Sequence, residues 1–113
     1  MHEMSIAEGI VDIALDTMKN NDGTVVHAVR LRLGAMSGVE PDALLFCFEA
    51  VTKGTAAEGA ELVIEHVPLK AKCLDCLTEF VVEGYRFICP ACQSTMVTTV
   101  TGRELQVLSI DMD

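Results

Sequence analysis

The first 20 residues carry apolar side chains at the spacing of a helix. The positions that share one helical face are Ile6, Ile10, Ile13, Ala14 and Met18. Ser5 and Glu8 have the spacing of a capping box, in which each side chain bonds the other residue's backbone N–H. The polar run 20–23 contains turn-forming residues. The pattern therefore predicts a helix over residues 5–19 that begins at Ser5.

Three later segments read as strands, with a second helix between the first two. Residues 24–34 and 104–112 alternate in the manner of strands, and 61–67 reads as a further strand ended by Pro68. The second helix begins at Glu40-Pro41-Asp42, because proline suits a first helical turn, and ends near Gly54. These elements predict an α+β domain with two helices packed on a three-stranded sheet.

Residues 69–102 differ in character from the rest of the chain. They contain two pairs of cysteines and few large apolar residues, so apolar burial alone would not hold them together. We interpret this segment as an inserted, zinc-ribbon-like subdomain with four cysteine ligands. The predicted domains are 1–68 plus 103–113 for the α+β part and 69–102 for the insertion.

The two cysteine pairs have the spacing of a zinc site. They are Cys73-x-x-Cys76 and Cys89-x-x-Cys92, separated by the twelve residues 77–88. Two such turns facing each other complete a tetrahedral shell of four thiolates, and that closed shell leaves no open position for catalysis. The residues therefore predict a structural zinc ion. Two disulfides, an iron centre or a thiol redox pair are the alternatives.

Charge and composition exclude several functions. The 113 residues contain 17 acidic and 8 basic side chains, a formal net charge of -9, and the basic residues do not cluster. This balance opposes binding to nucleic acid. The N-terminus has neither the basic nor the apolar region of a signal peptide, and no apolar run is long enough for a membrane span. We expect a cytoplasmic protein that binds no membrane.

The first three residues form a possible metal site. The α-amine of Met1, the amide nitrogen of His2 and its imidazole form a row of nitrogen donors, which suits square-planar Ni(II) or Cu(II). Glu3 adds a carboxylate as a ligand or as a partner that orients the imidazole. An ordinary frayed terminus is the alternative, because Met-His also begins proteins by chance.

Taken together, the motifs resemble the HypA/HybF family of nickel metallochaperones for nickel-iron hydrogenase. The matching segments are Met-His-Glu-Met-Ser at the start, residues 31–37 (Leu-Arg-Leu-Gly-Ala-Met-Ser), Phe46-x-Phe48-Glu49 and the two cysteine pairs. The resemblance implies nickel binding through Met1 and His2, with Glu3 and Glu40 as further residues of the site. It also implies that the four cysteines hold zinc.

The resemblance further implies a role as a metal carrier rather than an enzyme. Members of this family deliver nickel together with a GTPase and dock on the hydrogenase large-subunit precursor, and some also support urease. No arrangement of nucleophile and base, and no phosphate-binding glycine loop, stands in the sequence. The alternative function is a zinc-ribbon adaptor between proteins without a nickel role.

Overall fold

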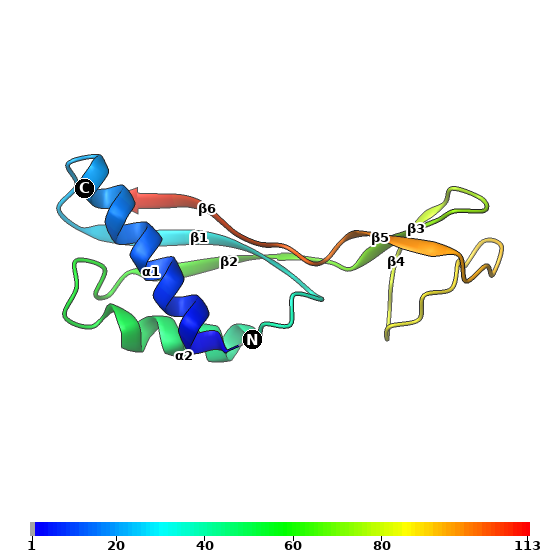
Figure 1. The fold of residues 1–113 in the computed structure, drawn as a ribbon, viewed down its shortest axis with the longest axis horizontal. Coiled ribbons are helices and arrows are strands. Elements are labelled where there is room, and N and C mark those ends of the chain that lie inside the picture. The colour runs from blue at the N-terminus through cyan, green and yellow to red at the C-terminus, as the bar shows by residue number, and fades with distance from the viewer. Residues whose placement is uncertain (1) are drawn as a thin grey trace. The chain divides into compact units, whose positions relative to one another are not determined.

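The computed structural model describes residues 2–113, and its chain forms two helices and six strands within that range (Figure 1). The elements in order are α1 (Glu3–Asn20), β1 (Val26–Gly34), α2 (Pro41–Thr52), β2 (Glu61–Val67), β3 (Lys70–Cys73), β4 (Glu79–Val81), β5 (Val97–Thr101) and β6 (Leu105–Met112).

By the contacts between its residues, the chain separates into two compact units. Unit 1 takes in the described residues up to Arg32, then Gly38–Glu65 and Gln106–Asp113, and unit 2 takes in Leu33–Ser37 and His66–Leu105.

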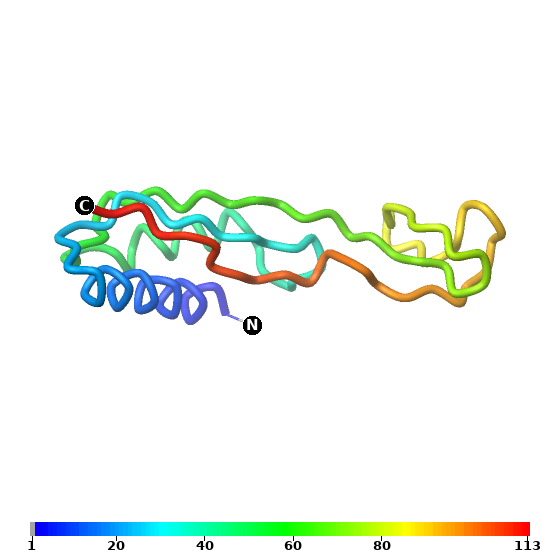
Figure 2. The backbone as a smooth tube through the Cα atoms, turned by 90° about the horizontal axis from the view of Figure 1, so that it is seen from above, coloured from blue at the N-terminus to red at the C-terminus, as the bar shows by residue number. Residues whose placement is uncertain are grey.

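Unit 1 contains the two helices and most of a sheet with the strand order β2-β1-β6, visible as neighbouring traces in Figure 2. Backbone bonds join Thr24 and Val25 to Asp113, so β1 and β6 run antiparallel. The strand β2 follows β1 after the crossover through α2. Both helices cover the same face of this sheet (Figures 1 and 2). The α+β prediction is thereby confirmed.

The core of unit 1 follows the predicted periodicities except at Ile13, which was predicted on the apolar face of the first helix but is 49% exposed. The buried side chains of α1 and α2 are Ala7, Ile10, Val11, Ala14 and Met18, then Leu44, Phe48 and Thr52. They face the buried strand residues Val29 and Leu31 of β1, whereas Arg30 between them is exposed. Apolar burial therefore holds the helices to the sheet.

The predicted start of the first helix is wrong. The helix begins at Glu3, and Ser5 and Glu8 lie inside it, so they do not form a capping box. His2 is the N-cap: its backbone is extended, with φ −89° and ψ 125°, and its carbonyl accepts the Ile6 N–H across 3.2 Å. An acidic residue in the first turn suits the positive end of a helix, which favours a start at Glu3 over one at Ser5.

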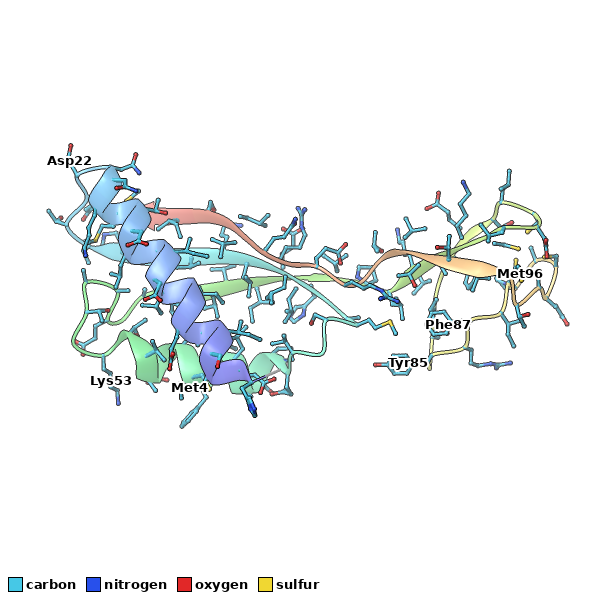
Figure 3. All side chains as sticks on the ribbon, in the orientation of Figure 1. Met4, Asp22, Lys53, Tyr85, Phe87 and Met96 are labelled. Carbon is cyan, nitrogen blue, oxygen red and sulfur yellow. The ribbon has the colours of Figure 1, made fainter. Side chains whose placement is uncertain are left out.

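Unit 2 contains a second sheet with the order β4-β3-β5, in which both pairings are antiparallel. The sequence did not predict these short strands. Their core consists of Leu69, Ala71 and Val82, against which four partly buried side chains pack: Met36, Phe80, Phe87 and Val97. Phe87 thus anchors the loop after β4, while Tyr85 on the same loop is 67% exposed and points outward (Figure 3).

Two glycines allow backbones to approach closely in unit 2. The Met36 N–H donates to the Gly102 carbonyl across 2.6 Å, and the Gly34 N–H donates to Glu104 across 2.8 Å. A Cβ on Gly34 would lie 2.2 Å from the carbonyl oxygen of Gly102. Glycine at position 34 is therefore a packing requirement.

None of the helices within residues 2–113 combines the length and apolar character that crossing a membrane requires.

Candidate metal centre

The four cysteines lie on two knuckles with the same backbone geometry. In the first, the Leu77 N–H donates to the Cys73 carbonyl across 2.9 Å, and in the second the Gln93 N–H donates to Cys89 across 2.8 Å. Leu77 and Gln93 both have positive φ, 65° and 63°. The backbone N–H of the first cysteine in each knuckle then donates to the fifth residue after it, Thr78 or Ser94, across 2.9 Å. The knuckles are a structural repeat.

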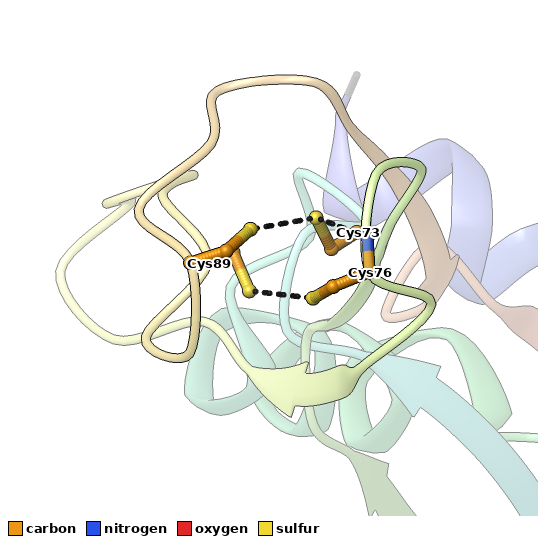
Figure 4. A group of neighbouring side chains, drawn as sticks. Cys73, Cys76 and Cys89 are labelled. Carbon is orange, nitrogen blue, oxygen red and sulfur yellow. Dashed lines mark hydrogen bonds between the residues drawn. The ribbon is translucent and has the colours of Figure 1, made fainter.

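The knuckles bring all four sulfurs to one place. Sγ of Cys73 lies 3.5 Å from Sγ of Cys92, and Sγ of Cys76 lies 3.5 Å from Sγ of Cys89 (Figure 4). All four lie within 4.8 Å of one another. A tetrahedral zinc ion with Zn–S bonds of about 2.3 Å separates its sulfurs by about 3.8 Å. The cluster could therefore hold zinc with little movement.

The cysteines are free thiols. All five lie in the described residues, and Cys47 on α2 stands apart from the cluster. The 3.5 Å contacts are far longer than the roughly 2.05 Å of a disulfide bond. The disulfide alternative from the sequence is therefore not the state seen here.

The environment of the thiols differs between positions. Cys73 and Cys89 are fully buried, whereas Cys76 and Cys92 are exposed. The Thr78 hydroxyl, 3.2 Å from Cys76 Sγ, and the Thr78 backbone lower the pKa of Cys76 to about 6. The Ser94 backbone lowers the pKa of Cys92, but the neighbouring thiols, Cys73 first, outweigh it and raise the value to about 12. A bound dication would hold all four as thiolates.

Three polar residues around the cluster were missed in the sequence. Thr78 and Ser94 stand two residues after the second cysteine of each pair, and Asp75 lies inside the first pair. The Ser94 hydroxyl donates to the Asp75 carboxylate. The repeated Cys-x-x-Cys-x-Thr/Ser pattern in the sequence could have indicated that Thr78 and Ser94 belong to the cluster.

The structure brings together three of the four predicted nickel residues of unit 1. His2 precedes α1 and is exposed, and among the described contacts its side chain makes no capping hydrogen bond. The Glu40 N–H donates to the Glu3 carboxylate across 3.2 Å. The fourth residue, Met1, lies outside the described residues.

The carboxylates of Glu3 and Glu40 both accept hydrogen bonds from backbone N–H groups at the start of α2. Glu40 is the N-cap of that helix, and its carboxylate accepts the Ala43 N–H across 2.6 Å. The hydrogen bond from the Glu40 backbone is the main cause that lowers the pKa of Glu3. Both carboxylates thus accept a hydrogen bond from a backbone N–H.

A family model and curated relatives that match this chain all carry the name HypA. The family model described as "Hydrogenase/urease nickel incorporation, metallochaperone, hypA" matches residues 1–112. A hydrogenase maturation factor HypA from Geobacter metallireducens is 47% identical over the whole of both chains. A protein of the same name from Acidithiobacillus ferrooxidans is 40% identical, also over the whole of both chains.

Solved structures show the same fold at lower sequence identity. The solution structure of the Ni metallochaperone HypA from Helicobacter pylori matches with a TM-score of 0.66 and 23% identity, covering 99% of this chain and 97% of that one. A second solution structure, of a HypA protein, matches with a TM-score of 0.73 and 24% identity over 99% and 96%. The full-length family match and the identity to relatives confirm the resemblance. The chain belongs to the HypA family of nickel metallochaperones.

Proposed function

We propose that the chain binds one Ni(II) ion at its N-terminus and passes it on during maturation of nickel-iron hydrogenase. The donors are the α-amine of Met1 and the amide and imidazole nitrogens of His2, with Glu3 and Glu40 beside them. The observation that carries the proposal is the position of His2. Its imidazole is exposed and is not used to cap α1, so it is free to bind a metal.

The carboxylates of Glu3 and Glu40 offset the positive charge at the start of the helices, which would otherwise oppose a bound cation. The N-terminus of a helix carries partial positive charge, which opposes a cation by a few tenths to about 1 kcal/mol. Glu3 and Glu40 place negative charge at the first turns of α1 and α2. A ligand role for Glu40 would use the carboxylate oxygen that does not accept the Ala43 N–H. We therefore propose both residues as part of the nickel site.

We further propose that Cys73, Cys76, Cys89 and Cys92 bind a structural Zn(II) ion. The support is the distance set among their sulfurs, which matches a tetrahedral shell. Four thiolate ligands fill the coordination sphere, so this metal would stabilise unit 2 and would not catalyse a reaction. We expect the protein to act as a carrier and not as an enzyme, in the reducing cytoplasm that keeps its thiols free.

The partners we propose are those that nickel transfer requires. They are a nickel-handling GTPase of the maturation pathway and the hydrogenase large-subunit precursor. Urease is a second candidate target, because the matching family description names both enzymes. A carrier with an exposed metal site can lose its ion to a receiving site of better geometry, which favours transfer inside a complex.

A nickel titration of zinc-loaded protein tests the site. The native chain should bind one equivalent of nickel, and the His2→Ala variant should bind none while keeping its fold and zinc. His66→Ala is the matched control, because His66 is also exposed but lies on β2. Equal nickel binding by the native chain and His2→Ala would rule out the proposed site.

A further inference from the structure

A side-chain hydrogen bond crosses between the two cysteine knuckles in addition to the sulfur–sulfur contacts. The Ser94 hydroxyl, in the second knuckle, donates to the carboxylate of Asp75, which lies between Cys73 and Cys76 in the first. The same hydroxyl oxygen accepts the Met96 N–H across 3.0 Å. The Ser94 carbonyl accepts the Cys89 N–H across 2.9 Å. Ser94 thus bonds within its own knuckle through its carbonyl and to the other knuckle through its hydroxyl.

This contact is not a consequence of the knuckle repeat. Thr78 holds the position in the first knuckle that Ser94 holds in the second, yet its hydroxyl contacts Cys76 of its own knuckle, 3.2 Å away. Ala91 holds the position equivalent to Asp75 and offers no polar side chain. The Asp75–Ser94 bond therefore has no counterpart between Ala91 and Thr78, the equivalent positions with the knuckles exchanged.

We infer that Asp75 and Ser94 are a positioning pair that holds the knuckles at the spacing a metal needs. The inference rests on the zinc site proposed above. Ionised thiolates repel one another, so contacts other than those of the sulfurs help to hold the knuckles together. One such contact is the backbone bond from Leu74 to the Met96 carbonyl, at 2.8 Å. The Asp75–Ser94 bond adds a charge-assisted contact beside it.

A role of Asp75 through its charge alone is separated from a role through the bond by Ser94. The Asp75 carboxylate attracts the Zn(II) ion, so Asp75→Asn would speed release by loss of charge as well as by loss of the bond. Ser94→Ala removes the bond and leaves every charge in place. Faster release in Ser94→Ala therefore assigns the effect to the bond.

Zinc release from the full chain to an excess of a chromogenic chelator tests the pair. We expect Ser94→Ala and Asp75→Ala each to raise the release rate on the order of tenfold, as loss of a charge-assisted hydrogen bond would. The double variant should release no faster than either single one, because both remove the same contact. Ser94→Thr keeps the hydroxyl and should restore slow release. Thr95→Ala, an exposed neighbour in the same loop, is the matched control.

A second readout shows whether the variants still form the site. Co(II) in place of zinc should give the absorption of four thiolate ligands in every variant, which separates a loosened site from a lost one. Unchanged release in Ser94→Ala, with or without faster release in Asp75→Ala, would overturn the positioning role. If the native chain itself held no zinc or Co(II), the zinc assignment would fail, and this inference with it.

Discussion

The backbone N–H of Glu40 donates to the carboxylate of Glu3 across 3.2 Å, although 37 residues separate the two in sequence. The bond joins the first turn of α1 to the first turn of α2. It places the Glu40 backbone beside Glu3, the residue that follows His2, the N-cap of α1. The geometry of the proposed nickel site therefore depends on how the two helices begin.

The Glu3–Glu40 bond should make stability depend on pH in the acid range. The backbone donor lowers the pKa of Glu3 in the folded chain, so the bond stabilises the fold above the unfolded pKa and is lost as pH falls through the lower folded value. Glu3→Gln should lower the thermal midpoint at about pH 7 and should have less effect near pH 3. Glu8→Gln controls for loss of an acidic charge on α1. An equal effect of Glu3→Gln at both pH values would contradict this assignment.

His27 and Asp113 should show the opposite dependence. Nε2 of His27 lies 2.9 Å from Oδ2 of Asp113, and this contact raises the pKa of His27. The pair therefore stabilises the fold below the unfolded pKa of histidine, about 6.5, and the stabilisation disappears as pH rises through the higher folded value. NMR titration of the His27 ring should give a lower pKa in Asp113→Asn than in the native chain. The same pKa in both would show that the contact does not form in solution.

The positive φ angles of Leu77 and Gln93 predict a stabilising substitution. A residue with a Cβ is strained in this left-handed region by roughly 1–2 kcal/mol, while glycine is not. Leu77→Gly and Gln93→Gly should each stabilise zinc-loaded unit 2 by about 0.5–1 kcal/mol, after the entropy that glycine adds to the unfolded chain. Thermal unfolding measures the change. Leu74→Gly, at an exposed position of the same knuckle outside the positive-φ set, should destabilise.

Two glycines should respond to alanine in opposite directions. Gly9 lies in α1 and a Cβ there meets no atom within 4 Å, so Gly9→Ala should stabilise the helix by up to about 1 kcal/mol. Gly34→Ala would place Cβ against the backbone of Gly102 and should cost more than about 2 kcal/mol. Denaturant unfolding of both variants measures the difference. A mild effect of Gly34→Ala would show that the two backbones are not in close contact.

The sequence predicted the elements of unit 1 well because burial there is periodic. The strand 61–67 has the predicted bounds, and the second helix begins at Pro41 as expected. The start of α1 was misplaced, because Ser5 and Glu8 have the spacing of a capping box but lie inside a helix that begins at Glu3. The strands β3, β4 and β5 were missed, because short segments such as Glu79–Val81 carry too few residues for a periodic signal.

The metal-binding residues were predictable to different degrees. The cysteine spacing alone predicts a four-thiol cluster, and the structure forms that cluster. Asp75 and Ser94 were missed because their contact depends on how the two knuckles face each other. By contacts, residues Leu33–Ser37 group with unit 2, in whose core Met36 packs. The nickel ligands and the domain boundaries stay predictions.

The most direct test of the nickel site is a titration that changes only the terminal amine. Zinc-loaded protein with its native Met1 terminus is compared with a variant that carries one additional glycine before Met1, by calorimetry and visible absorption. The native chain should bind one Ni(II) ion with the absorption of square-planar nitrogen ligands, and the extended chain should lose that signal. Identical binding and absorption in both proteins would contradict a site that uses the α-amine of Met1 and the imidazole of His2.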